Sequence, residues 1–132
     1  MDILVGVDRS PESKNAFVSA MDIVAAVGGR IIAVHVTSED ESTAMDAAIA
    51  ELDSRAGDRG VDLESILVTG DPVEELPRIA AEHEVDAIYL GHRGLSSEGE
   101  EFPGERRGRL GSVARGVMQR SRIPVTVFDR GL

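Results

Sequence analysis

Five short apolar segments alternate with segments of helical periodicity, and this alternation constrains the fold more than any other feature of the 132-residue chain. The apolar segments are rich in Val and Ile, as expected of strands buried on both faces of a parallel sheet. They are Ile3–Val7, Arg30–Val36, Leu63–Val68, Ala87–Leu90 and Pro124–Phe128. Strands that alternate with helices indicate βαβ units. We therefore predict one α/β domain over residues 1–132, an open five-stranded parallel sheet with helices on both faces.

The segments between the predicted strands carry the signals of four helices. The first helix is expected to begin at Ser10-Pro11, as N-cap and first helical residue, and to end at Gly28-Gly29. Apolar positions at helical spacing predict the second over Met45–Ala56, and the fourth is predicted over Ser112–Arg120. The third contains Pro77, which we expect to shorten or kink its first turns.

One connection is much longer than the others. The segment Leu95–Leu110 is polar and rich in Gly and Pro, so it does not fit a packed helix or strand. Loops of this length are usually functional or disordered. The sequence shows no internal repeat and no domain linker, so this segment is expected to be an insertion within the single domain.

The charge of the chain is strongly acidic and its basic residues are almost all arginine. The formal net charge is −10, and Lys14 is the one lysine among 14 basic residues. Dispersed acids with so little lysine resemble the surfaces of proteins from a salt-loaded cytoplasm, such as that of haloarchaea, where a short Debye length suppresses self-repulsion. An acidic mesophilic protein with arginine favoured by GC-rich codons is the alternative.

Composition also excludes several classes of protein. A net-acidic chain with one lysine lacks the electrostatic surface that nucleic-acid binding requires. The absence of cysteine excludes disulfides and thiolate metal sites and agrees with a reducing compartment. The first residues have the pattern of a strand rather than a signal peptide, and no apolar run has the length of a membrane span. We therefore expect a cytoplasmic protein with neither nucleic acid nor membrane as partner.

Glycines and a helix start are predicted to converge at one edge of the sheet. Gly91 and Gly94 follow the fourth strand, and Gly111-Ser112 begins the next helix. If the strand order is 3-2-1-4-5, these residues and Asp8 face one crevice at the switch point, where open α/β sheets bind ligands. Glycine lets backbone approach a ligand, and the helix N-terminus favours an anion. The pattern predicts a phosphate-binding site, in which Asp8 holds a ribose hydroxyl or a divalent cation.

Simpler roles exist for each residue taken alone, because glycines after strands usually form turns and serine usually caps a helix. There is no P-loop, no G-x-G-x-x-G and no G-x-S-x-G motif. The three histidines lack metal-ligand spacing: His35 is expected to be partly buried in its strand, and His83 solvated at a helix end. His92 and Arg93 lie between the glycines, where they either reach phosphate or form a surface turn.

The chain resembles the universal stress protein family over nearly its whole length. The resemblance rests on Asp8-Arg9-Ser10 after the first strand, His35-Val36 at the end of the second, Gly70-Asp71-Pro72 before the third helix, and Pro124-Val125-Thr126-Val127 near the end of the chain. The nucleotide-binding branch of that family has the pattern G-x2-G-x9-G-[ST]. Here the pattern begins at Gly91 and ends at Ser112, but sixteen residues replace the nine.

The resemblance implies a Rossmann-like fold of the adenine nucleotide alpha hydrolase type, and it implies roles for particular residues. Asp8 contacts the sugar or a metal ion, the backbone of Val36 contacts adenine, and Gly91 contacts ribose. The residues implied to hold the phosphates are Gly94, Gly111, Ser112 and Val113. The family usually forms dimers by pairing its last strand, here Ile123 to Phe128.

The resemblance therefore implies a cytoplasmic, dimeric sensor or regulator that binds ATP, with Mg or Mn on the phosphates. The long spacer either folds out as a surface loop, brings glutamates that repel the nucleotide, or supplies arginines that clamp the phosphates. The main alternative is a member that has lost nucleotide binding and acts by dimerisation and protein association. A slow ATP hydrolase is a third possibility, disfavoured because no residue has the setting of a general base.

Overall fold

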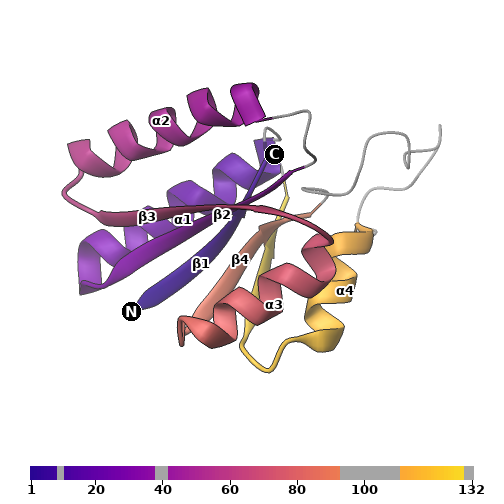
Figure 1. The fold of residues 1–132 in the computed structure, drawn as a ribbon. Helices are drawn as coiled ribbons and strands as arrows, with labels where there is room; N and C mark the ends of the chain where they lie inside the picture. Colours follow the sequence, from indigo (N-terminus) through magenta and orange to yellow (C-terminus); the bar gives the residue numbers. More distant parts are fainter. Residues whose placement is uncertain (9–10, 38–41, 93–110, 130–132) are drawn as a thin grey trace.

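The computed structural model describes residues 1–8, 11–37, 42–92 and 111–129 of the chain. Five strands form one parallel sheet in the order β3-β2-β1-β4-β5, which confirms the predicted order. Helices α1 and α2 cover one face, and α3 and α4 cover the other (Figure 1). The elements are β1 (Asp2–Val7), α1 (Pro11–Val27), β2 (Arg30–Thr37), α2 (Ser42–Asp58), β3 (Asp62–Thr69), α3 (Pro72–Glu82), β4 (Ala87–Gly91), α4 (Ser112–Arg120) and β5 (Val125–Phe128).

The core consists of two apolar layers separated by the sheet. Alternate residues of β1 supply them: Val5 packs with α1 and α2, while Leu4 packs with α3 and α4. The central strands β1 and β4 are buried along almost their full length, as predicted.

The two edge strands differ from the expectation that all five are buried on both faces. In β3 exposed and half-buried residues alternate, and Leu67 is 43% exposed. β5 begins at Val125, one residue later than predicted, and its residues are exposed or half-buried. Within the described part of the chain, each of these strands has a sheet neighbour on one side only, so its apolar composition does not lead to complete burial.

The signals at the helix ends act largely as predicted. Gly28 and Gly29 follow α1 with φ of +87° and +124°, a region that side chains disfavour. A Cβ on Gly29 would lie 1.9 Å from the backbone oxygen of Met1, so glycine is required there on steric grounds also. The Asp71 carboxylate caps α3 by accepting a 3.0 Å hydrogen bond from the Val73 N–H. The predicted Ser10 cap of α1 lies outside the described residues.

Pro77 lies inside α3 and does not shorten it, so of the two expected effects, shortening and kinking, the first is wrong. The helix runs for 11 residues through this position. The missing N–H of a proline removes one backbone hydrogen bond, but Leu76, Ile79 and Ala80 of the same helix are buried in the core. Packing of this apolar face maintains the helix, in keeping with the rule that tertiary contacts dominate helix stability.

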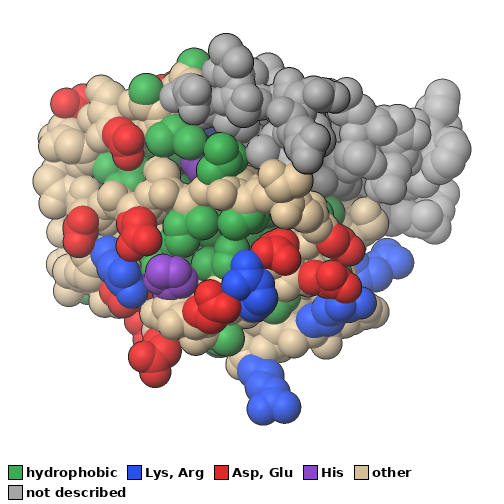
Figure 2. All heavy atoms as spheres, viewed as in Figure 1, with side chains coloured by type: hydrophobic (Ala, Val, Ile, Leu, Met, Phe, Trp, Pro, Cys, Tyr) green, Lys and Arg blue, Asp and Glu red, His purple; other side chains and the backbone are tan. Residues whose placement is uncertain are grey.

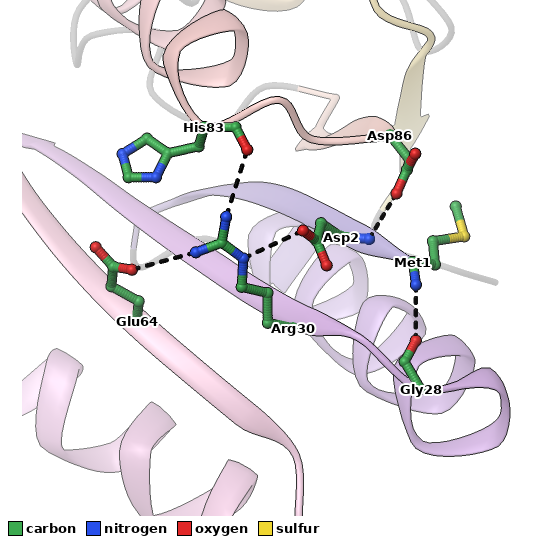
Figure 3. A network of polar contacts seen from close by, with 7 residues as sticks. All are labelled: Met1, Asp2, Gly28, Arg30, Glu64, His83 and Asp86. Atoms are coloured by element: carbon green, nitrogen blue, oxygen red, sulfur yellow. Dashed lines mark hydrogen bonds and ion pairs between the residues drawn. The ribbon is translucent and has the colours of Figure 1, made fainter.

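A polar network closes the sheet at the edge where β1, β2 and β3 begin (Figure 3). The Arg30 guanidinium pairs with Asp2 at 3.2 Å and Glu64 at 3.5 Å, and donates a 3.3 Å hydrogen bond to the carbonyl of His83 at the end of α3. The Asp2 N–H donates to the Asp86 carboxylate at 2.8 Å. One half-buried arginine thus joins three strands and a helix at the edge opposite the predicted crevice.

Ion pairs also cover the outer side of α3. Arg78 pairs with Glu75 and, at 2.7 Å, with Glu82 on the same helix, and Arg120 of α4 lies 3.7 Å from Glu74. Figure 2 shows acidic and basic side chains interspersed over the part of the surface where these helices lie. Such exposed pairs contribute little to stability one by one, at most about 1 kcal/mol each.

Candidate functional site

The carboxyl ends of β1 and β4 meet at the switch point of the sheet. These strands are neighbours, with Ile3 paired to Ala87 and Val5 to Tyr89. Asp8 follows β1 directly, Gly91 ends β4, and His92 comes next. The structure therefore brings these three predicted site residues to one edge of the sheet. This edge is where open α/β sheets bind their ligands.

The start of α4 is attached to the same edge by backbone hydrogen bonds. The N–H of Gly111 donates to the carbonyl of His92 at 2.9 Å, and the N–H of His92 donates to the carbonyl of Phe128 at 2.6 Å. Gly111 is the N-cap and has no side chain that could accept from the first turn. The first turn of this nine-residue helix, beginning at the exposed Ser112, therefore presents backbone N–H groups at the switch point.

Gly91 has a steric reason to be glycine that the sequence did not indicate. A Cβ at this position would lie 2.8 Å from both the Cβ of Glu12 and the backbone nitrogen of Ser13. Distances under 3.0 Å are essentially never found for real Cβ atoms, so the first turn of α1 occupies the space that a side chain would need. The glycine allows α1 to pack closely on β4, whatever role its backbone has toward a ligand.

Ser13 is a residue of this edge that sequence reasoning missed. Its side chain is 1% exposed, and its Oγ accepts a 3.0 Å hydrogen bond from the Asp8 N–H and lies 3.4 Å from the carbonyl of Gly6. The hydroxyl therefore holds the backbone of Asp8 against the first turn of α1. The sequence does contain a signal for this contact. Ser13 is the third residue of the helix and lies five residues after Asp8, which follows the strand.

The two histidines near this edge are more buried than the sequence suggested. His35, expected to be partly buried, is completely buried, and its two ring nitrogens have no hydrogen-bond partner among the described residues. Burial lowers its pKa below the ordinary value of 6.5, and the nearby charge of Asp53 opposes this shift in part. His92 is 9% exposed, and its buried Nε2 likewise has no hydrogen-bond partner in the described structure. The surface-turn alternative for His92 is therefore wrong.

The other predicted residues are distributed as follows. Val36 lies near the end of β2 and packs, half-buried, against the core layer under α3 and α4, and Val113 of α4 is buried in that same layer. His83 is the C-cap of α3, as expected of a helix-end residue, and is half-buried. Arg93 and Gly94, together with the long spacer, lie outside the described residues.

No metal site is evident in the described part of the chain, where no three His, Asp or Glu residues are grouped so that they could hold an ion. A cation at Asp8 would need ligands from a bound molecule, since Mg²⁺ commonly binds through one or two carboxylates plus substrate phosphates. Within the same ranges, no helix is both long enough and apolar enough to cross a membrane.

The fold is that of a doubly wound α/β protein, and its candidate site lies at the carboxyl ends of β1 and β4. Residues 1–129 match the model of the universal stress protein family, and the chain belongs to that family. The universal stress protein YxiE of Bacillus subtilis is 36% identical over 73 residues, which make up 55% of this chain and 45% of that relative. The aligned part thus spans less than half the length of that protein.

Solved structures extend the similarity to the whole fold. A crystal structure of a universal stress protein in complex with cAMP has a TM-score of 0.77 and 28% identity, covering 99% of this chain and 98% of that one. A universal stress protein from Archaeoglobus fulgidus DSM 4304 has a TM-score of 0.76 and 28% identity, covering 98% of this chain and 44% of that one. The predicted family and fold are therefore confirmed.

Proposed function

We propose that this chain is a sensor or regulator that binds ATP in the crevice between β1 and β4. One observation carries the proposal: the hydrogen bond from the Gly111 N–H to the His92 carbonyl holds the start of α4 at the switch point. A helix N-terminus attracts phosphate through hydrogen bonding and the helix dipole. The cAMP complex of a relative 28% identical to this chain supports an adenine nucleotide as the ligand.

In this proposal each residue has the role that the family resemblance implies. Asp8 binds the ribose or a divalent cation (Mg or Mn) on the phosphates, Val36 offers its backbone to adenine, and Gly91 approaches the ribose. His92 and Arg93 add donors between the glycines. The proposed phosphate-binding residues are Gly94, Gly111, Ser112 and Val113.

We also propose that the protein forms a dimer and that it does not hydrolyse ATP. β5 is an edge strand, with a neighbour on one side only, so its outer edge can pair with β5 of a second copy. We expect no ATP hydrolysis, because catalysis by a general base needs a residue that a second group orients toward the attacking water. Both statements are testable apart from ATP binding, by sedimentation and by phosphate release.

Calorimetry with ATP and Mg²⁺ tests the central claim, and the chain offers a matched pair of variants. Gly111 has φ −64° and ψ 160°, an extended conformation that valine adopts readily, so Gly111→Val leaves the backbone unstrained. Its side chain would stand where the phosphates approach the first turn of α4, and binding should be lost. Gly57→Val is the control, since none of the described residues has an atom within 4 Å of a Cβ at that position.

Each outcome decides between the proposal and its alternative. We expect micromolar binding for the wild type and for Gly57→Val, and none for Gly111→Val. Ser112→Ala should only weaken binding, since one hydrogen bond to a charged group contributes about 1.5–3 kcal/mol. Absence of heat from the wild type, together with absence of nucleotide released on denaturation, would support a member that acts through dimerisation and protein association alone.

A further inference from the structure

A cavity of about 490 Å³ opens between α1 and α2, above the carboxyl end of β1. Apolar side chains from all three elements line it, among them Val7, Phe17 and Leu52, and charged residues stand among them. Figure 1 shows α1 and α2 side by side on this face of the sheet. The volume falls within the range of about 300–1,000 Å³ that is usual for small-molecule sites.

The apolar lining of this cavity lies on the α1 and α2 side of the sheet, while its polar end reaches the edge where the nucleotide site is proposed. Val7, Phe17 and Leu52 belong to the core layer under α1 and α2, whereas Val36 and Val113 pack in the layer under α3 and α4. Asp8, at the end of β1, is the one residue of the proposed nucleotide set that also lines the cavity. The apolar part of the cavity is therefore lined by residues that the nucleotide proposal does not use.

The charges at the cavity limit what that occupant can be. Two acids and two bases line it: Asp8, Glu51, Lys14 and Arg55. Arg55 is neutralised by Glu51, one helical turn away at 3.2 Å. A balanced set of charges does not favour a polyanion such as a second nucleotide triphosphate, which would need a surplus of cations.

Lys14 is the cation that remains for a ligand. It is exposed on α1, and no ion pair joins it to another residue in the described ranges. It is also the only lysine in a chain of net charge −10, so a negative group would meet repulsion over most of the remaining surface. The lining suits an apolar body, and Lys14 offers a partner for one negative group attached to it.

We propose that this cavity binds an apolar molecule that carries one carboxylate, such as a medium-chain fatty acid. The hydrocarbon part lies against Val7, Phe17 and Leu52, and the carboxylate lies at Lys14. The inference does not depend on nucleotide binding, because Asp8 is the one residue of the proposed nucleotide set in the cavity lining.

Octanoate is a suitable probe, and its uncharged analogue octanamide tests the carboxylate. Ala48→Leu on α2 should fill the cavity, because the half-buried Ala48 is part of its lining. Ala50→Leu is the matched control: it makes the same change on the same helix, at an exposed position outside the lining. Lys14→Met removes the charge and keeps an apolar stem, and Lys14→Arg restores the charge.

Titration by calorimetry, without nucleotide, should show octanoate binding to the wild type and to Ala50→Leu. For Ala48→Leu the affinity should fall about tenfold or more, because the leucine side chain takes the place of methylene groups that octanoate would bury. Lys14→Met should weaken octanoate about threefold and leave octanamide unchanged, as expected for one exposed charge pair, and Lys14→Arg should bind as the wild type does.

Two results would overturn the inference. One is the absence of octanoate binding by the wild type at millimolar concentration. The other is equal affinity of Ala48→Leu and Ala50→Leu, which would show binding elsewhere on the surface. Should Ala48→Leu fail to fold, methyl chemical shifts of the wild type decide instead: octanoate must shift Ala48 and Leu52, and shifts confined to exposed methyl groups would contradict the proposal.

Discussion

Two Gly→Ala substitutions in this chain should change stability in opposite directions. At Gly91 the new Cβ would lie 2.8 Å from atoms of Glu12 and Ser13, one of them the backbone nitrogen of α1, so the helix must move. Overpacking of this kind costs about 1–3 kcal/mol. The loss of unfolded-state freedom on replacing glycine returns about 0.4–1 kcal/mol. The net expectation is a free energy of unfolding lower by about 0.5–2 kcal/mol.

At Gly57 the same substitution meets no atom within 4 Å and lies in the last turn of α2. Alanine is a better helix former than glycine by about 0.5–1 kcal/mol, so Gly57→Ala should be more stable than the wild type. Each variant differs from the wild type by one methyl group. The two measurements therefore compare the same chemical change in two different surroundings.

Urea unfolding of the three proteins, without nucleotide and in one salt buffer, measures the effect. We expect midpoints in the order Gly57→Ala, wild type, Gly91→Ala, with unchanged m-values. A midpoint of Gly91→Ala equal to or above that of the wild type would refute the packing argument. Gly91 would then be explained by its backbone role toward a ligand, and only a binding assay would detect its substitution.

Three further predictions concern salt, assembly and pH. If the charge of −10 reflects a salt-loaded cytoplasm, thermal melts should show a higher melting temperature in multimolar potassium chloride than in dilute buffer, and equal temperatures would count against that origin. Val127→Lys on β5 should convert dimers to monomers in sedimentation, whereas Leu67→Lys on the opposite edge strand should not; a wild type that sediments as a monomer in high salt contradicts the dimer. Burial disfavours the charged form of His35 and lowers its pKa in the folded state, so its contribution to stability is present above pH 6.5 and is lost as the pH falls below it. Urea unfolding should therefore show a smaller loss of stability on acidification for His35→Leu than for the wild type, and parallel pH curves for the two proteins would disprove it.

The fold was predictable because each strand and helix has a local signal. The buried centre of β1 and the glycines after α1 specify their elements without reference to the rest of the chain. The helices between the strands indicated a parallel sheet, since parallel strands need crossover connections, but they do not fix which strands are neighbours, so the order was assumed. The fourth helix was predicted with its observed bounds, Ser112–Arg120, because Gly111 precedes it and Pro124 follows it.

The details of the site were less predictable because they arise from contacts between distant segments. Nothing near Gly91 in the sequence indicates that Glu12 and Ser13 pack against it, about eighty residues away in the chain. His92 resembles a turn residue, and its burial follows from the backbone bonds that draw α4 and β5 against it. The exposure of Leu67 depends on β3 being an edge strand, which is a property of the whole sheet.

Both backbone groups of His92 form hydrogen bonds. Its N–H donates to the carbonyl of Phe128, and its carbonyl accepts from the N–H of Gly111. The last strand and the start of α4 are therefore connected through the peptide groups of one residue. Sliding of β5 along β4 must either move the first turn of α4 with it or break one of these bonds, each of which is worth about 0.5–1.5 kcal/mol. A second protein that binds the outer edge of β5 would therefore contact a strand that is linked through His92 to the N–H groups proposed to hold phosphate.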